Sequence, residues 1–244
     1  MSALTARLAG RFAHEALALG AGEVCALRRR GFYLRFPGGR FACIGEAALG
    51  GGPLNALVEA LPGATLGQRF TVDTAHAEPW KPPDCTGAFP ENAGAIARAA
   101  AGRAPAQGLG GLIAGSHNPL SVHAQPALEA LERWLVGNAL SAEAEALIGL
   151  GPGVTAPGDD YLGGVLVALR LAGRGAQAAS LWRWLAPRLA GRTREISAAH
   201  LAAAAAGEAQ EALHQVLNGE PAFDALDAAG WDGLAGALAV AKTY

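Results

Sequence analysis

The spacing of hydrophobic and polar residues divides the chain into a strand-like first third and a helical remainder. Short runs rich in Val, Phe, Tyr and Ile are typical of strands, whereas apolar residues spaced near 3.6 positions are typical of helices. Pro37-Gly38-Gly39 indicates a hairpin, because proline presets φ for a turn and glycine supplies positive φ. We predict strands over residues 23–28, 31–36, 40–45 and 68–74.

Prolines gather where the strand-like pattern ends, at positions 79, 82, 83 and 90. Such a cluster predicts an exposed crossing loop over residues 79–90. The segment over residues 54–61 reads as a short helix, and the strands before the loop assemble most simply as a small antiparallel β-sheet or barrel. We therefore expect an α+β protein with a strand-rich domain over 1–78 and a mainly α-helical domain over 91–244.

The expected helices of the second domain share apolar spacing near 3.6, and Gly or Pro separates most of them. They cover residues 92–103, 121–136, 141–148, 160–171, 177–189, 193–206, 208–217, 222–229 and 234–241.

Two glycine-rich segments of this domain resemble each other. Residues 158–166 and 230–238 align with Gly, Asp, Leu, Gly and Leu in register. Each copy is expected to place an Asp, Asp160 or Asp232, at a helix start, where a carboxylate stabilises unpaired amides and the positive end of the dipole. The small residues one turn later would let another backbone approach closely.

Composition narrows the class of protein. A chain of 244 residues, 51% hydrophobic and with a net charge of -2, can bury its own core, which excludes disorder. We expect no membrane span and no signal peptide, since charges interrupt every long apolar run and the first twenty residues. Scattered arginines near charge balance argue against nucleic acid. Three widely spaced cysteines, Cys25, Cys43 and Cys85, favour a cytoplasmic protein, with Cys85 either a reactive thiol or a buried filler.

The candidate site is a loop that leads into the helix expected at residue 160. It reads Gly151-Pro152-Gly153-Val154-Thr155-Ala156-Pro157-Gly158-Asp159-Asp160. Such a loop exposes backbone amides before a helix N-terminus, which suits an anion or a polar carbonyl. It is not a phosphate-binding P-loop, because no Gly-Lys-Ser/Thr follows, and the helical pattern before it excludes a dinucleotide fingerprint.

The two carboxylates qualify the anion interpretation, because they would repel a phosphate. Either Mg²⁺ joins Asp159 or Asp160 to a phosphate, or these side chains accept hydrogen bonds from NH and hydroxyl groups of the ligand. A third interpretation is structural, with Asp159 as the helix N-cap and Asp160 as a first-turn acid.

Asn118 also has two interpretations: it lies in a binding pocket with His117, or it caps the helix expected after Pro119.

Residues 150–164 resemble the signature of a bacterial family, whose usual form is Gly-Pro-Gly-Leu-Thr-Pro-Ser-Gly-Asp-Asp-x-Leu-x-Gly. This family includes the AllH-like subunit of oxamate carbamoyltransferase from anaerobic allantoin degradation. Residues 193–197 with Gly207-Glu208 resemble its next block, and residues 230–236 resemble its last. Ala156-Pro157 departs from the usual Pro-Ser and removes a hydroxyl.

The resemblance implies a cytoplasmic subunit of a multi-subunit enzyme of nitrogen and purine catabolism. Its partners would resemble acyl-CoA synthetase subunits, and the complex would transfer a carbamoyl group between oxalurate and phosphate. Two other hypotheses stay open. One is a non-catalytic regulatory or scaffold subunit whose Gly- and Ala-rich helices pack against partner chains, and the other is a stand-alone metal-dependent enzyme acting on a small phosphate or amide compound.

Roles for the site residues follow from the chemistry of the loop. Glycine amides would bind a carbamoyl or phosphate oxygen, as an oxyanion hole does. Thr155 would donate a hydrogen bond, and Asp159 and Asp160 would accept hydrogen bonds from carbamoyl NH groups or hold Mg²⁺. The expected catalytic residues are Asp159, Asp160 and Thr155, and the expected substrate-binding residues are Gly151, Pro152, Gly153, Gly158, Asp232 and Asn118.

Overall fold

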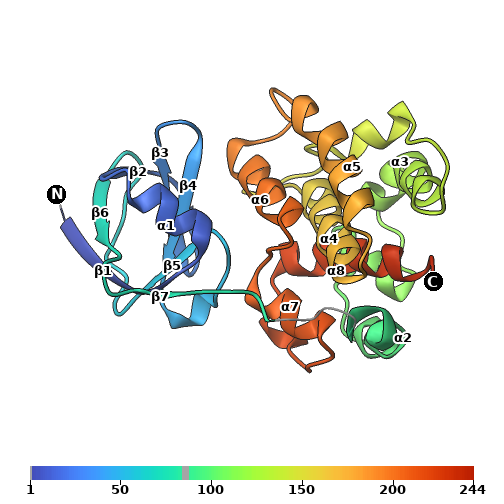
Figure 1. Cartoon of the computed structure of the whole chain (residues 1–244), viewed down its shortest axis with the longest axis horizontal. Coiled ribbons are helices and arrows are strands. Elements are labelled where there is room, and N and C mark those ends of the chain that lie inside the picture. The colour runs from blue at the N-terminus through green and yellow to red at the C-terminus, as the bar shows by residue number, and fades with distance from the viewer. Residues whose placement is uncertain (1, 84–87) are drawn as a thin grey trace. The chain divides into compact units, whose positions relative to one another are not determined.

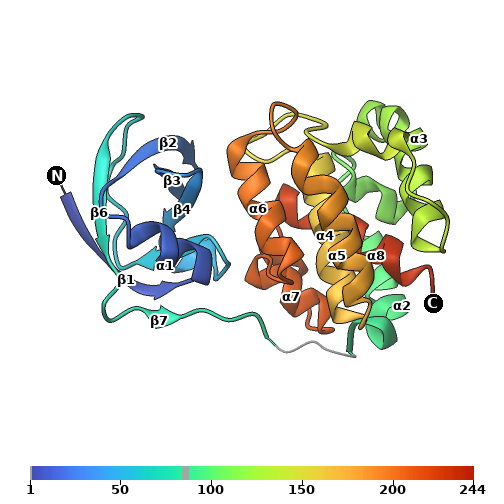
Figure 2. The same ribbon diagram turned by 45° about the horizontal axis from the view of Figure 1, so that its top comes forward.

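A computed structural model describes residues 2–83 and 88–244 of the chain (Figures 1 and 2). The chain divides into two compact units, Met1–Pro83 and Asp84–Tyr244. Cys85 and the middle of the proline-rich segment lie outside the described residues. None of the helices in the described ranges combines the length and the apolar character needed to cross a lipid bilayer.

Six described strands of the first unit close into a barrel. Around the barrel the order is β1-β5-β4-β3-β2-β6, and β1 closes it by pairing antiparallel with β5 and parallel with β6. A short β7 extends the sheet beyond β1. The elements are β1 (Ser2–Ala9), α1 (Arg11–Leu17), β2 (Gly22–Arg28), β3 (Gly31–Phe36), β4 (Arg40–Gly45), the 3-10 helix η1 (Ala47–Leu49), β5 (Asn55–Val58), β6 (Arg69–Asp73) and β7 (Glu78–Pro79).

The structure confirms the four predicted strands as β2, β3, β4 and β6. The predicted hairpin is also confirmed, since Gly38 and Gly39 have φ of +74° and +66° in the turn between β3 and β4. The short helix expected over residues 54–61 is wrong. Its apolar residues form β5, which lies between β4 and β1, and a short apolar run does not distinguish helix from strand by its spacing.

The second unit is helical, which confirms the α+β class. Most predicted helices are present with shifted ends, although residues 141–148 form a 3-10 helix and residues 222–229 are mostly outside an α-helix. The elements are α2 (Ala88–Ala101), η2 (Gly110–Ala114), α3 (Pro119–Leu135), η3 (Ala142–Leu147), α4 (Pro157–Leu171), α5 (Gly175–Leu185), η4 (Ala186–Arg188), α6 (Glu195–Ala205), α7 (Glu211–Leu217), η5 (Phe223–Ala225) and α8 (Ala228–Ala241).

Helices α4 and α8 pack against each other through glycines. A Cβ atom on Gly164 would lie 1.8 Å from the carbonyl oxygen of Gly233, and one on Gly236 would lie 2.0 Å from that of Tyr161. These four residues occupy equivalent positions of the two aligned segments, so the contact is reciprocal. The expectation that small residues permit close backbone approach is confirmed, and the approaching backbone is that of the other copy.

The expected position of Asp232 at a helix start is wrong. Helix α8 begins at Ala228, six residues before the predicted Leu234, and Asp232 lies inside it. Asp227 is the actual N-cap, because its side chain accepts a hydrogen bond from the amide of Gly230.

Candidate functional site

The backbone of the loop over residues 149–158 depends on its glycines. Gly149, Gly151 and Gly153 have φ of +72°, +96° and +135°, a region that favours glycine. Within the described part of the chain, the amides of Gly151 and Gly153 donate no hydrogen bond to a protein atom, so they are available to a ligand. The amide of Gly158 is not available, because it donates to the carbonyl oxygen of Leu150 at 3.0 Å.

Gly158 has a packing role instead of the ligand contact we expected. A Cβ atom there would lie 2.0 Å from the carbonyl oxygen of Leu147 at the end of η3. Glycine therefore allows the first turn of α4 to lie against the segment that precedes the loop. Pro152, at the exposed tip, makes no polar contact that would define a role for it.

Asp159 is buried and anchors the loop. Its carboxylate accepts hydrogen bonds from the amide of Gly149 at 2.9 Å and from the hydroxyl of Thr193, and it also interacts with Ser197. Burial raises the pKa of Asp159, and these hydrogen bonds oppose the rise. The N-cap interpretation is wrong, because α4 begins at Pro157 and its N-cap is Ala156.

Sequence reasoning did not connect Thr193 and Ser197 with Asp159. The hydroxyl of Ser197, on α6, also accepts a hydrogen bond from the amide of Ala156 at 3.1 Å. Thr193 and Ser197 therefore hold both ends of the first turn of α4. The signal that could have revealed this was the presence of two hydroxyl residues within residues 193–197.

Asp160 lies on the other side of this turn and is only partly buried. The hydroxyl of Thr155 donates a hydrogen bond to its carboxylate at 2.9 Å. Burial raises the pKa of Asp160 well above its ordinary value, and the negative charges of Asp232, Asp227 and Asp159 add to this rise. The structure thus brings Thr155 and Asp160 together, a contact that we did not predict, whereas their expected contacts with a ligand stay predictions.

Asp232 binds backbone amides at the start of η2. One carboxylate oxygen accepts from Leu109 at 2.6 Å and from Gly110 at 2.8 Å. The side chain is buried, which raises the pKa of Asp232 to about 6 although the two amides oppose the rise.

Asn118 is fully engaged as a helix cap. Its side-chain oxygen accepts from the amide of Ser121 at 3.0 Å, and the Ser121 hydroxyl accepts from the amide of Asn118. Its side-chain nitrogen donates to the carbonyl oxygens of Ala106 and Gly108. The capping interpretation is therefore confirmed, and no polar atom of this side chain is left for the substrate contact that we expected.

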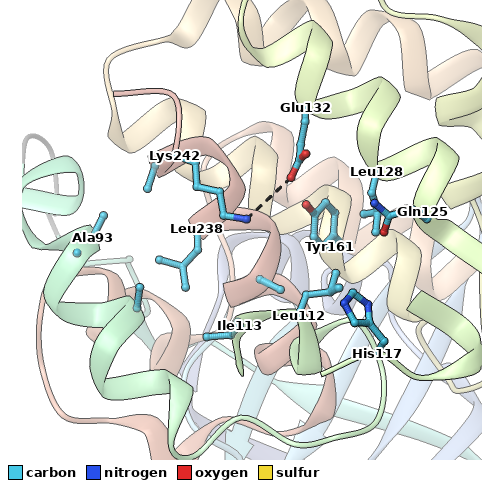
Figure 3. Close-up of a pocket in the computed structure, with 14 residues that line it drawn as sticks. Ala93, Leu112, Ile113, His117, Gln125, Leu128, Glu132, Tyr161, Leu238 and Lys242 are labelled. Atoms are coloured by element: carbon cyan, nitrogen blue, oxygen red, sulfur yellow. Dashed lines mark ion pairs between the residues drawn. The ribbon is translucent and has the colours of Figure 1, made fainter. Parts of the chain in front are cut away.

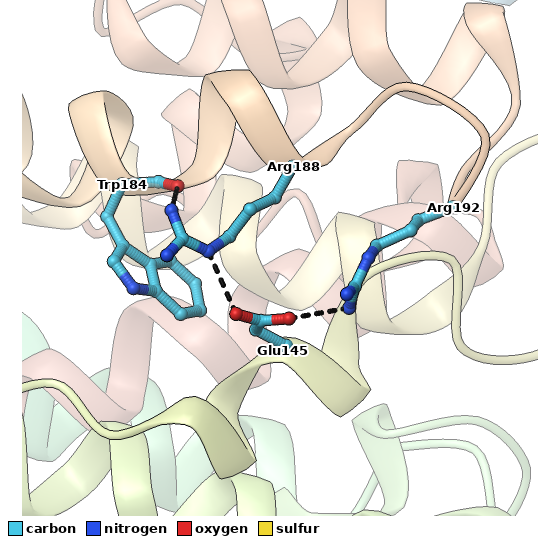
Figure 4. Close-up of polar contacts among 4 residues, drawn as sticks. All are labelled: Glu145, Trp184, Arg188 and Arg192. Carbon is cyan, nitrogen blue, oxygen red and sulfur yellow. Dashed lines mark hydrogen bonds and ion pairs between the residues drawn. The ribbon is translucent and has the colours of Figure 1, made fainter.

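A charged cluster ties the segment before the loop to the chain beyond α5 (Figure 4). Glu145 of η3 forms ion pairs with Arg188 at 2.9 Å and with Arg192 at 2.7 Å. Arg188 also donates to the carbonyl oxygen of Trp184 and stacks its guanidinium over that ring. The carbonyl oxygen of Arg192 would lie 2.0 Å from a Cβ atom on Gly149, so this cluster and Gly149 bring the two segments together.

Residues 2–83 and 88–244 contain no group of three or more His, Cys, Asp or Glu side chains arranged to hold a metal ion. Because Asp159 is saturated by its own partners, Asp160 is the loop carboxylate best placed to meet Mg²⁺ or a ligand. A single carboxylate beside free amides favours direct hydrogen bonding to an amide-containing ligand over a dedicated metal site.

We expect Thr193→Val to lower the free energy of unfolding by about 2 kcal/mol, because it leaves a buried carboxylate oxygen of Asp159 without its hydroxyl donor. Thr193→Ser keeps the hydroxyl and should stay within about 0.5 kcal/mol of the native chain. Urea unfolding monitored by circular dichroism measures both. Equal losses in the two variants would show that the hydroxyl is not the cause.

Comparison with known proteins places the loop in a family context. Residues 147–227, about a third of the chain, match the family described as Oxamate carbamoyltransferase subunit AllH. No curated protein and no solved structure matches the chain. The matched segment contains the loop, Asp159, Asp160 and Thr193, and the match agrees with the resemblance of residues 150–164 to this family.

Proposed function

We propose that this chain is a subunit of an oxamate carbamoyltransferase-like complex and that its loop over residues 149–158, with Asp160, forms part of the carbamoyl-binding site. The description of the matched family as a subunit of that enzyme supports the reaction and the need for partner chains. The observation that carries the site is the combination, in one loop, of two free amides with a carboxylate held by a hydroxyl.

The chemistry of a carbamoyl group fits these donors and acceptors. Its carbonyl oxygen accepts hydrogen bonds, which the amides of Gly151 and Gly153 supply, and its NH₂ group donates hydrogen bonds, which the Asp160 carboxylate accepts. When a nucleophile attacks the carbamoyl carbon, negative charge develops on that oxygen. Fixed backbone amides stabilise this developing charge more strongly than they stabilise the neutral carbonyl of the ground state. In related sites one such donor lowers the activation barrier by about 3 kcal/mol.

Within this proposal the three carboxylates have different roles. Asp160 contacts the substrate, and Thr155 orients the Asp160 carboxylate. Asp159 and Asp232 are positioning residues, since their oxygens are bound to protein groups of the loop, of the turn before α6 and of the segment before η2. The partner chains resemble acyl-CoA synthetase subunits, the complex acts in allantoin degradation in the cytoplasm, and the substrates are oxalurate and phosphate.

A scaffold role is the second candidate, and the internal bonding of Asp159 favours it. Its carboxylate accepts hydrogen bonds from the Gly149 amide and the Thr193 hydroxyl, which is the pattern of a structural residue. In this case the loop would fix the fold of a subunit whose surfaces serve assembly.

Asp160→Asn distinguishes the two candidates in the complex purified with its partner chains. We expect carbamoyl transfer from oxalurate to phosphate, followed as carbamoyl phosphate, to fall at least tenfold in kcat, because the amide no longer offers two acceptor oxygens. Asp224→Asn, an exposed carboxylate of the matched segment, is the control and should keep full activity.

Full activity of Asp160→Asn in a complex of native composition would refute the proposed site and leave the scaffold role. Activity of the isolated chain that requires Mg²⁺ and disappears in Asp160→Asn would point to the stand-alone enzyme instead.

A further inference from the structure

The helical unit contains a cavity of about 460 Å³ that the loop does not use (Figure 3). It lies among α2, η2, α3, α4 and α8, and none of its lining residues belongs to the loop over residues 149–158. Its volume is within the range of pockets that enclose small molecules.

Most of the cavity wall is apolar, and small residues create the space. Ala93 and Ala97 of α2 and Ala235 and Ala241 of α8 leave room where larger side chains would meet. Leu112, Leu128 and Leu238 supply the larger apolar surfaces. The apolar part of a ligand bound here would be shielded from water on several sides. Burial of apolar surface is the main source of affinity in such a pocket.

Tyr161 is the buried polar group of the wall. Its side chain is 3% exposed, and its hydroxyl makes no hydrogen bond within the described ranges. Figure 3 shows this hydroxyl directed to the side of the cavity where Glu132 and Lys242 meet. Burial and the charge of Glu132 raise the pKa of Tyr161, so the phenol stays protonated and can donate. The hydroxyl opens into the cavity without a protein partner among the described residues, so it is free to donate to an acceptor atom of a ligand there.

The polar rim carries no net preference for either sign of charge. Lys242 lies 3.9 Å from Glu132, and both side chains reach solvent. Gln125 and His117 complete the rim. A charged ligand would therefore lose about as much to one member of the pair as it gains from the other, whereas an uncharged ligand avoids this cost.

We propose that this cavity binds an uncharged, mainly apolar small molecule that carries a carbonyl or hydroxyl oxygen, with its apolar body against α2 and α8 and its oxygen accepting a hydrogen bond from Tyr161. The site is separate from the one proposed for carbamoyl transfer. The experiments below measure ligand binding and not carbamoyl transfer, so either proposal can fail without the other.

The first experiment titrates the full chain with Nile red, an uncharged apolar dye with a carbonyl oxygen, and follows its fluorescence. We expect saturable binding at one site. Ala97→Leu adds side-chain volume to the cavity wall and should lower the affinity at least tenfold. Ala99→Leu places the same change on the exposed side of α2, outside the lining, and should leave the affinity unchanged.

The second experiment tests the hydroxyl with two competitors of equal size, 2-acetylnaphthalene and 2-isopropylnaphthalene. Only the ketone has an acceptor oxygen. Tyr161→Phe removes one hydrogen bond and should weaken the ketone about fivefold while the affinity of the hydrocarbon stays the same.

Three results would overturn the proposal. The first is the absence of saturable dye binding to the native chain. The second is equal binding by the native chain and Ala97→Leu. The third is self-association of the native chain in size-exclusion chromatography, with no dye binding, that Ala97→Leu abolishes. In that case a second copy of the chain would occupy the cavity.

Discussion

Replacing Gly164 by alanine will lower the free energy of unfolding by about 3 kcal/mol or more, because the added methyl group has no space. Its Cβ atom would lie 1.8 Å from the carbonyl oxygen and 2.8 Å from the Cα atom of Gly233. These are backbone atoms, which cannot change rotamer, so α4 and α8 must move apart. Separation would expose apolar residues on both helices, which are buried along most of their length.

Gly163 provides the matched control. A Cβ atom there would lie 3.6 Å from that of Ala204, an ordinary van der Waals contact. Gly163→Ala should therefore be neutral or stabilise the helix by up to about 1 kcal/mol, since alanine has the higher helix propensity. Urea unfolding compares the two variants. Equal stabilities would contradict the tight backbone contact.

The second large effect is expected at Asp232. Asp232→Ala leaves the buried amides of Leu109 and Gly110 without an acceptor and should destabilise the unit by about 3 kcal/mol. Asp232→Asn keeps one oxygen in place and should retain most of the stability. If alanine and asparagine were equally tolerated, the two amide bonds would not hold the start of η2.

The asparagine variant also tests the charge of Asp232. The pKa of about 6 in the folded chain exceeds the value of about 4 expected for an unfolded Asp. The protonated form is thus favoured by folding, and its contribution to stability is full below pH 4 and is lost as the pH rises through 6. Relative to Asp232→Asn, the native chain should lose on the order of 2 kcal/mol between pH 4 and 7. A constant difference across this range would contradict the raised pKa.

The sequence allowed the strands with local partners to be predicted, whereas the closure of the barrel depends on distant pairing. Strands β2, β3 and β4 follow one another as antiparallel neighbours, and the turn between β3 and β4 contains the signal Pro37-Gly38-Gly39. Strand β1 was missed, because it pairs with β5 and β6, which come about fifty and seventy residues later. The apolar run of β5 is a strand that pairs with β4 and β1, a tertiary context that its own spacing does not reveal.

For the candidate site, the sequence revealed the unusual backbone but not the partners of its side chains. Positive φ at Gly151 and Gly153 agrees with the glycine-rich pattern. The N-cap interpretation of Asp159, one of the alternatives, was wrong, since its partner Thr193 is 34 residues away in the chain and no local signal connects them. Asp232 was misplaced for a similar reason, because an earlier cap at Asp227 starts the helix.

The reciprocal contact of α4 and α8 has a consequence for how this protein can change in evolution. Asp160 and Tyr161 are neighbours in the chain, yet one side chain meets Thr155 of the loop and the other lines the cavity. Both residues lie on α4, and the close backbone contacts at Gly164 and Gly236 fix the position of α4 against α8. Each site can therefore acquire new side chains, and with them a new specificity, while the geometry of its neighbour is inherited intact.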